Sequence, residues 1–147
     1  MRIALASDHA GYAEKERLKT VLTDLGVEFD DLGTASEASV DYPDYARQVA
    51  EQVAQGQVEQ GLLVCGSGTG MAITANKVPG VRAAVAWSEE TARLARQHND
   101  ANVLAIGART TPPADNPKIV RAWFSTEFEG GRHAARVAKI SEVERSY

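Results

Sequence analysis

The architecture of this chain follows from one stretch of sequence, LLVCGSGTG at residues 62–70. The run from Leu62 to Cys65 is apolar throughout, which is typical of a central parallel strand that is covered on both faces. Three glycines among the next five residues end the strand in a tight turn, and we expect a helix over residues 71–77. The stretch therefore predicts one strand–turn–helix unit of an α/β protein, whose sites lie beyond the carboxyl ends of the strands.

Similar patterns recur on both sides of this unit. Apolar segments predict four more strands, over residues 2–7, 27–32, 81–86 and 102–107. Helical spacing and end signals predict five further helices, over about residues 12–25, 42–55, 89–97, 118–125 and 132–143. Asp41 and Ser88 are suited to cap two of them. The alternation predicts a single domain over residues 1–147 with a Rossmann-like three-layer α/β fold: a five-stranded parallel sheet, helices on both faces and an extra C-terminal helix.

Composition and charge exclude several classes of protein. Lys and Arg number 16 and Asp and Glu number 20, so a net charge of −4 gives no positive field to hold a nucleic acid, and none is expected as a partner. No apolar run approaches the ~20 residues that cross a bilayer, so no membrane partner is expected. The opening Met1 to Leu5 lacks a signal-peptide pattern, and we expect a cytoplasmic protein. The single cysteine, Cys65, can form neither an internal disulfide nor a thiol pair.

The glycine-rich turn at residues 66–70 is the first candidate site. Its backbone N–H groups and the start of the following helix can together hold an anion. The turn does not match the dinucleotide fingerprint, because Met71 stands at the third glycine position, and it lacks the Gly-Lys-Ser/Thr ending of a P-loop. Cys65 at the first glycine position excludes a serine nucleophile elbow. The alternative is that the glycines only shape a tight turn.

Two chemically active groups are expected beside this turn. A cysteine directly before a helix N-terminus is favoured as a thiolate, which makes Cys65 a candidate base or nucleophile. A cysteine in an apolar run can equally be an inert core residue. Asp8 and His9 follow the first predicted strand, so we expect them at the same sheet edge. Asp8 has an alternative role as a cap of the next helix.

Basic residues in the second half of the chain suggest a phosphate site. Arg132 and Arg136 are four apart on a predicted helix and hence on one face, and Arg109 follows the fifth strand. Paired arginines suit a phosphate dianion, because guanidinium groups make charge-assisted hydrogen bonds to it. Exposure to solvent is the ordinary alternative for spaced arginines, and Arg96 is interpreted in that way. We expect the arginine pair at the same sheet edge as Cys65.

His98 and Asn99 follow the helix that begins at Ser88. His98 in the last helical turn can interact favourably with the negative end of the helix dipole, and Asn99 can end the helix in a left-handed conformation. The pattern alone favours this local interpretation and a functional one equally.

Taken together and in order, these motifs resemble a family of sugar-phosphate isomerases that includes ribose-5-phosphate isomerase type B and galactose-6-phosphate isomerase. The likeness covers nearly the whole chain and is greatest to the type B branch. It is carried by six segments: Ser7–Gly11, Asp41–Pro43, Cys65–Gly70, Ala75–Lys77, Arg96–Asp100 and Glu129–His133. The resemblance implies interconversion of ribose 5-phosphate and ribulose 5-phosphate, a step of the pentose phosphate pathway, without a metal or an organic cofactor.

The resemblance also implies roles for single residues. Cys65 is expected to be the base that moves the proton, and His98 and Asp8 are expected to open the sugar ring. The enediolate would be stabilised by Ser67 and by the turn residues Gly66, Gly68, Thr69 and Gly70. Phosphate contacts are expected from His9, Arg132 and Arg136, with Arg109 as a fourth, and further substrate contacts from Tyr42 and Asn99.

The same resemblance implies a homodimer, which could pair further into a tetramer, with the active site at or near the subunit boundary. Met71 stands where some relatives carry a catalytic glutamate, so the chain is interpreted as the cysteine type.

Three alternatives stay open at this point. The substrate could be another phosphorylated aldose, namely an allose, galactose or erythrose phosphate. Cys65 could be the nucleophile of a hydrolase or amidotransferase, with His98 or His9 as its base. Outside catalysis, the glycine turn could belong to a small module that binds a nucleotide or phosphate.

Overall fold

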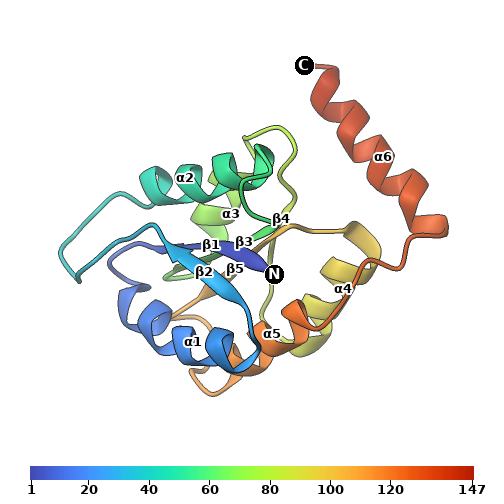
Figure 1. Ribbon diagram of the computed structural model, residues 1–147. Helices are drawn as coiled ribbons and strands as arrows, with labels where there is room; N and C mark the ends of the chain where they lie inside the picture. The colour runs from blue at the N-terminus through green and yellow to red at the C-terminus, as the bar shows by residue number, and fades with distance from the viewer.

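In the computed structural model, which describes residues 1–147, five parallel strands form one sheet (Figure 1). The strands are β1 (Arg2–Ser7), β2 (Glu28–Asp31), β3 (Gln60–Cys65), β4 (Ala83–Val85) and β5 (Val103–Gly107). Their order in the sheet is β2-β1-β3-β5-β4, so β3 is the central strand. All five predicted strands are confirmed, and the apolar run before the glycine turn is buried along its whole length.

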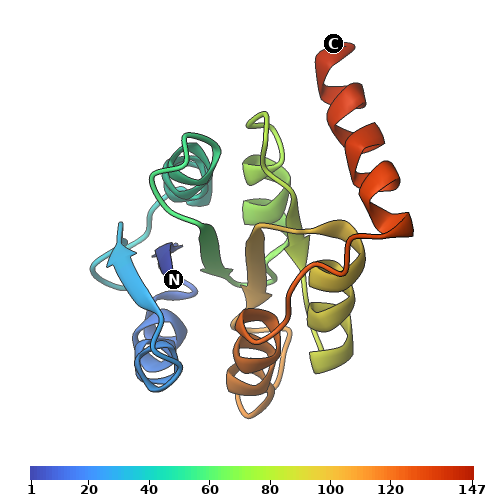
Figure 2. The same ribbon diagram turned by 45° about the vertical axis from the view of Figure 1, so that its right-hand side comes forward.

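Helices cover both faces of the sheet (Figure 2). One face is covered by α1 (Tyr12–Asp24), α4 (Glu89–Asn99) and α5 (Asp115–Phe124), and the other by α2 (Tyr42–Ala54) and α3 (Thr69–Ala75). The last helix, α6 (Arg132–Arg145), extends away from these layers. The predicted three-layer α/β fold with an extra C-terminal helix is therefore confirmed.

Alternation along the strands builds two separate apolar cores. Leu5, Leu62 and Leu104 are paired neighbours in β1, β3 and β5, and all three belong to the core beneath α1 and α5. Leu63 and the residues paired with it in β1 and β5 point to the opposite face of the sheet, into the core beneath α2 and α3. Because side chains alternate between the faces of a strand, a strand covered on both sides must be apolar throughout, as β3 is.

The helix ends confirm one expected cap and correct three expectations. The Ser88 side chain accepts from the Thr91 amide at 3.1 Å, and Thr91 completes a capping box. Asp41 precedes α2 in an extended conformation, but its side chain makes no capping bond. The left-handed residue that ends α4 is Asp100, with φ 46°, and not Asn99.

The third correction concerns Arg96, which is buried and not in solvent. Its guanidinium donates to the carbonyl oxygens of Ala101 at 2.6 Å and Thr126 at 3.2 Å, and it lies over the Trp123 ring. Ala101 follows the end of α4, and Thr126 follows the end of α5. Arg96 therefore ties the two helices together.

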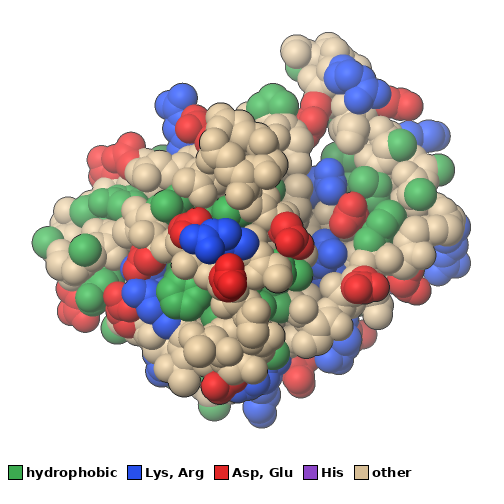
Figure 3. All heavy atoms as spheres, in the orientation of Figure 1, with side chains coloured by type: hydrophobic (Ala, Val, Ile, Leu, Met, Phe, Trp, Pro, Cys, Tyr) green, Lys and Arg blue, Asp and Glu red, His purple; other side chains and the backbone are tan.

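The projecting helix α6 leaves a groove of about 830 Å³ between itself and the start of β4, visible as a hollow in Figure 3. Ile140 and Val143 on α6 line this groove and are 41% and 60% exposed. Acidic and basic side chains are interspersed over the face drawn in Figure 3. None of the helices combines the length and the apolar character that crossing a membrane requires.

Candidate active site

A cleft of about 440 Å³ lies at the carboxyl edge of the sheet, where β1, β3 and β5 end. The loops that follow these strands form most of its wall, as the parallel topology predicts. Nine of the predicted site residues line it: Asp8, His9, Tyr42, Cys65, Gly66, Ser67, Thr69, Gly70 and Arg109. Ala10 and Ile73 complete the wall. Sequence reasoning missed Ile73, whose only signal is an apolar residue 57% exposed on a short helix.

Cys65 is the last residue of β3 and is only 5% exposed. Its Sγ accepts a hydrogen bond from the Gly68 amide at 3.1 Å. Gly68 adopts φ +80°, and a Cβ there would lie 3.1 Å from the backbone of Ile106. Only glycine fits this left-handed, crowded position without strain, so the turn holds its amide against the sulfur.

The glycine turn also presents unpaired donors. The amides of Ser67 and Gly70 have no hydrogen-bond partner within the chain, and both residues line the cleft. The first amides of a helix are always left without an intrahelical acceptor, so Gly70 in the first turn of α3 is free to bind a ligand. The Ser67 hydroxyl accepts from the Thr69 amide at 3.3 Å and is itself exposed. The turn can therefore donate several hydrogen bonds to an anionic oxygen.

Asp8 and His9 face the cleft from the loop after β1. Asp8 Oδ1 accepts from the Gly11 amide at 2.9 Å, so the residue does organise the start of α1 while it lines the cleft. The two interpretations of Asp8 are thus compatible. His9 Nδ1 lies 3.1 Å from the Val40 amide, from which it can accept, and 3.2 Å from the Val40 carbonyl oxygen, to which it can donate in the other tautomer. When Nδ1 accepts from the amide, Nε2 carries the proton and can donate to an acceptor such as a phosphate oxygen.

Tyr42 and Arg109 form two further parts of the wall. Tyr42 begins α2, and its ring lies against Gly70, where a Cβ would come within 2.6 Å of the ring carbon Cε1. Arg109 follows β5, and its amide donates to the Gly66 carbonyl at 2.9 Å, so its backbone is fixed while its side chain is exposed. The guanidinium is therefore available at the mouth of the cleft.

Four of the predicted residues do not share this edge: His98, Asn99, Arg132 and Arg136. Helix α4 starts after β4 and returns to the beginning of β5, so His98 and Asn99 at its end lie at the amino edge of the sheet. Asn102, just beyond, accepts from the Gly61 amide at the start of β3. The length of a five- or six-residue strand, about 16–20 Å, separates this edge from Cys65.

Arg132 and Arg136 share that location, because the segment before α6 is tied to the end of α4 by the Glu129 amide, which donates to the Gln97 carbonyl at 3.1 Å. Both arginines are exposed. The expectation that the arginine pair lies beside Cys65 is therefore wrong within one chain.

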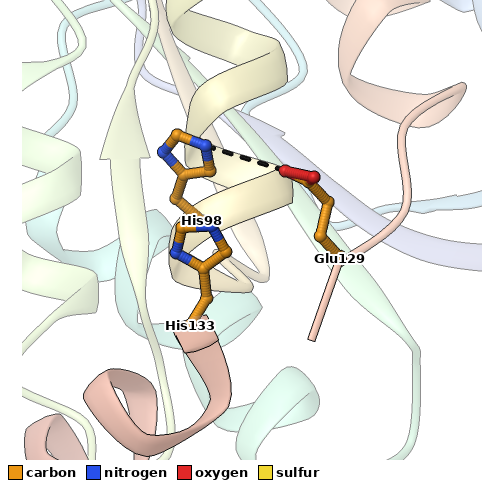
Figure 4. A group of neighbouring side chains, drawn as sticks. All are labelled: His98, Glu129 and His133. Atoms are coloured by element: carbon orange, nitrogen blue, oxygen red, sulfur yellow. Dashed lines mark ion pairs between the residues drawn. The ribbon is translucent and has the colours of Figure 1, made fainter. Parts of the chain in front are cut away.

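The amino-edge group is nevertheless organised. The rings of His98 and His133 stack with centroids 4.2 Å apart, and His98 Nε2 lies 3.7 Å from Glu129 Oε1 (Figure 4). Burial lowers the pKa of His133, and the charges of His98 and Arg132 lower it further. The chain thus carries two separate sets of polar groups, one at each end of the sheet.

Comparisons with known proteins agree with this architecture. The sequence profile of the ribose/galactose isomerase family matches residues 3–140. Ribose-5-phosphate isomerase B of Escherichia coli is 46% identical over 98% of this chain and 97% of its own length. A putative sugar phosphate isomerase of Bacillus subtilis is also 46% identical, over 98% of this chain and 97% of its own length.

Solved structures give the same result. Ribose-5-phosphate isomerase B of Clostridium thermocellum has a TM-score of 0.97 and 48% identity, covering 100% of this chain and 99% of that one. The enzyme of Mycoplasma genitalium, solved with bound ribulose-5-phosphate, has a TM-score of 0.94 and 42% identity, covering 99% and 97%.

The three-layer fold, the cleft beyond its strands and the matching relatives define an α/β enzyme. The chain belongs to the ribose/galactose isomerase family, and the relatives named above place it beside the type B ribose-5-phosphate isomerases.

Proposed function

We propose that the protein interconverts ribose 5-phosphate and ribulose 5-phosphate, with Cys65 as the base. The observation that carries the proposal is the meeting of a cysteine sulfur, free turn amides and the Asp8–His9 pair in one cleft. The relatives support it, because one is named ribose-5-phosphate isomerase B and another was solved with ribulose-5-phosphate.

The reaction moves one hydrogen between adjacent carbons. The thiolate of Cys65 takes the proton from C2 of the open-chain aldose, and the C–H electron pair forms a double bond between C1 and C2. Negative charge develops on the C1 oxygen. Return of the carbon-bound proton to C1, with transfer of the C2 hydroxyl proton to the C1 oxygen, leaves a ketone at C2 and a hydroxyl at C1. No electron enters or leaves, so the step needs no external oxidant or reductant.

The glycine turn is suited to stabilise the charge that develops. Amides that already point at the forming oxyanion reorganise little during the reaction, and each such donor contributes about 2.7–4 kcal/mol. The free amides of Ser67 and Gly70 and the exposed Ser67 hydroxyl fill this role in our proposal. The Gly68 amide donates to the Cys65 sulfur and holds it in place at the cleft.

We propose that the other half of the site comes from a second copy of the chain. His98 would then assist Asp8 in opening the sugar ring, while Arg132 and Arg136 would join His9 on the phosphate, with Asn99 as a further contact. This arrangement reconciles the motifs with the separation of the two sheet edges. The exposed arginines and the projecting α6 with its apolar Ile140 support it. The smallest assembly that shares sites in this way is a two-fold dimer.

The proposal is tested by assaying ribose 5-phosphate in parallel with allose, galactose and erythrose phosphates. We expect the highest kcat/KM with ribose 5-phosphate, and turnover that survives exhaustive chelation. Loss of turnover in chelator that a divalent metal restores would overturn the metal-free mechanism. No turnover on any phosphorylated aldose would overturn the isomerase assignment. A covalent acyl-enzyme trapped on Cys65 would favour a hydrolase instead.

A further inference from the structure

Three metal-ligating side chains meet at the amino edge of the sheet. His98 is in the last turn of α4, Glu129 lies in the segment before α6, and His133 is in the first turn of α6. One ligand atom from each lies within 4.8 Å of the other two. Figure 4 shows the Glu129 carboxylate facing His98 and the His133 ring stacked on the His98 ring. We propose that these three residues form a binding site for a transition-metal dication such as Zn²⁺, and that occupancy of this site inhibits the enzyme.

The backbone holds the three residues in place. The Glu129 amide donates to the Gln97 carbonyl at 3.1 Å, so Glu129 is fixed beside the residue that precedes His98. The His133 amide donates to the Gly130 carbonyl at 3.0 Å, which closes the turn between Glu129 and His133. The ligands therefore come from two elements that are already docked against each other.

The donor set fits a borderline metal. Two imidazole nitrogens and one carboxylate oxygen, with water as the fourth ligand, are a recurrent environment for Zn²⁺. Hard cations such as Mg²⁺ and Ca²⁺ prefer a shell of oxygens and keep more water. The imidazole of His133 is buried, so the protein holds this nitrogen donor in place.

Closing the site requires only side-chain movement. Zn–N bonds of 2.0–2.1 Å in a tetrahedron place neighbouring ligand atoms about 3.3 Å apart. His98 Nε2 and Glu129 Oε1 lie 3.7 Å apart, and their side chains are 38% and 52% exposed. Both can rotate without disturbing a core. The stacked rings must tilt, because both lone pairs have to point at a single ion.

Arg132 opposes metal binding, so its removal is expected to change the metal affinity in the opposite direction to the removal of a ligand. Its Nε lies 3.5 Å from His133 Nε2, where it shares the lone pair and repels a dication. Arg132 is exposed at the start of α6 and can turn away. Removing its charge should therefore tighten binding, whereas removing a ligand should weaken it. Loss of the neutral imidazole in His133→Gln removes no negative charge, so weaker binding in that variant separates coordination from non-specific attraction of a cation.

Inhibition rests on the proposed function, in which His98 opens the sugar ring. An ion that takes up the Nε2 lone pair of His98 prevents this nitrogen from exchanging a proton with the substrate. It also adds positive charge and bulk beside Arg132, a proposed phosphate contact. The binding itself does not depend on which reaction the enzyme performs.

Binding is tested by titrating Zn²⁺ into the full-length, chelator-stripped Cys65→Ser protein by calorimetry, so that no thiolate can contribute a competing site. We expect one ion per chain and no response to Mg²⁺. Glu129→Gln and His133→Gln should each weaken binding at least about tenfold, since loss of even an outer-shell partner costs 10–100-fold. Glu127→Gln, an exposed carboxylate two residues away, is the matched control and should bind normally.

Arg132→Gln should bind Zn²⁺ more tightly than its parent. No binding to the Cys65→Ser protein, or equal affinity in the Glu129 and Glu127 variants, overturns the proposed site. Circular dichroism of each variant confirms that it is folded.

Activity separates the inhibitory role from the site and from the proposed function. Zn²⁺ should inhibit the wild-type isomerase reversibly, chelator should restore it, and Glu129→Gln should require at least tenfold more Zn²⁺ for the same fractional loss. Zn²⁺ that binds the cluster without slowing an active isomerase overturns the inhibition alone. If no sugar phosphate is turned over, the proposed function fails while calorimetry still decides the metal site.

Discussion

The Gly68 amide donates a hydrogen bond to the Cys65 sulfur over 3.1 Å, and the sulfur accepts it at the end of the central strand. Cys65 is 5% exposed, so little water competes for its lone pairs. This contact sets Cys65 apart from the apolar side chains that precede it in the strand, and it supports the proposal that Cys65 is the base.

Replacement of Cys65 by alanine should reduce turnover and spare binding. The variant loses the proton acceptor but keeps the phosphate contacts, so we expect kcat to fall about 10²-fold or more, with little change in KM. Steady-state assays with ribose 5-phosphate measure both constants. Near-normal turnover would show that another group is the base and that Cys65 is a core side chain.

Mixing two inactive variants should restore activity if each site is shared between two copies. Cys65→Ala damages the carboxyl-edge half of a site and Arg136→Ala damages the amino-edge half. In a random mixture about half the dimers are hybrids, and each hybrid carries one intact site, so activity should approach about a quarter of the wild-type value.

The mixture is prepared by co-refolding the two variants and is assayed at low substrate concentration, where loss of Arg136 has its full effect on kcat/KM. Each variant refolded alone is the control. Activity of the mixture that equals the average of the two controls would contradict a shared site.

The sequence was sufficient for the fold because its local signals agree with one another. An apolar run covered on both faces, a glycine turn and helical spacing all predict the same α/β unit around β3. Residues that directly follow a strand, such as Asp8 and Arg109, were also placed correctly in the cleft. Their position depends only on strand direction, which a parallel sheet fixes.

The positions of residues that were assigned to the site only because of their chemical type were harder to predict. His98 precedes a strand, so its position at the amino edge could have been derived from the same rule of strand direction. Arg136 sits on a helix that follows the completed sheet, and its location depends on tertiary packing that no local pattern encodes. The burial of Arg96 was likewise hidden, because the carbonyls it satisfies belong to Ala101 and Thr126 on separate segments.

Acidification should destabilise the protein partly through His133. Burial and the charges of His98 and Arg132 lower the pKa of His133 below its ordinary 6.5. Above pH 6.5 the ring is neutral in both the folded and unfolded states and has no effect. Below it, the unfolded chain binds a proton that the folded ring resists, so the free energy of unfolding decreases as the pH falls toward the lower folded pKa.

His133→Gln should therefore lose less stability than the wild type between about pH 8 and about pH 5.5. Urea unfolding in the presence of chelator measures the difference at each pH. Lys139→Gln, an exposed change on the same helix, is the control for altered surface charge. An identical pH dependence in the wild type and the His133 variant would contradict this assignment.

The carboxylate of Asp31 neutralises a fully buried lysine, and we expect its removal to be costly. Lys15 Nζ lies 2.7 Å from both Asp31 oxygens and its side chain is 0% exposed, while Lys19 Nζ reaches Asp31 Oδ2 at 2.7 Å. Burial acts to raise the pKa of Asp31, but hydrogen bonds from Lys15 and Lys19 outweigh it, so the pKa is lowered from its ordinary 3.8.

Asp31→Asn keeps the size of the side chain but leaves the buried Lys15 ammonium with only the more distant Glu16 carboxylate, 3.9 Å away. Breaking a buried ion pair from one side typically costs 3–5 kcal/mol, and we expect about 3 kcal/mol here because Asp31 is partly exposed. The matched control on the same strand is Glu28→Gln, whose exposed pair with Arg2 should contribute little. Urea unfolding at neutral pH compares the three proteins.

The lowered pKa of Asp31 also predicts how the stability difference between the wild type and Asp31→Asn changes with pH. A carboxyl group whose pKa is lowered by folding stabilises the folded state above about pH 3.8 and loses that contribution as the pH falls through the folded value. The asparagine variant has no proton to bind at this position, so the stability gap between it and the wild type should shrink on acidification below about pH 3.8. A gap that stays constant across this range would show that Asp31 acts through shape and not through charge.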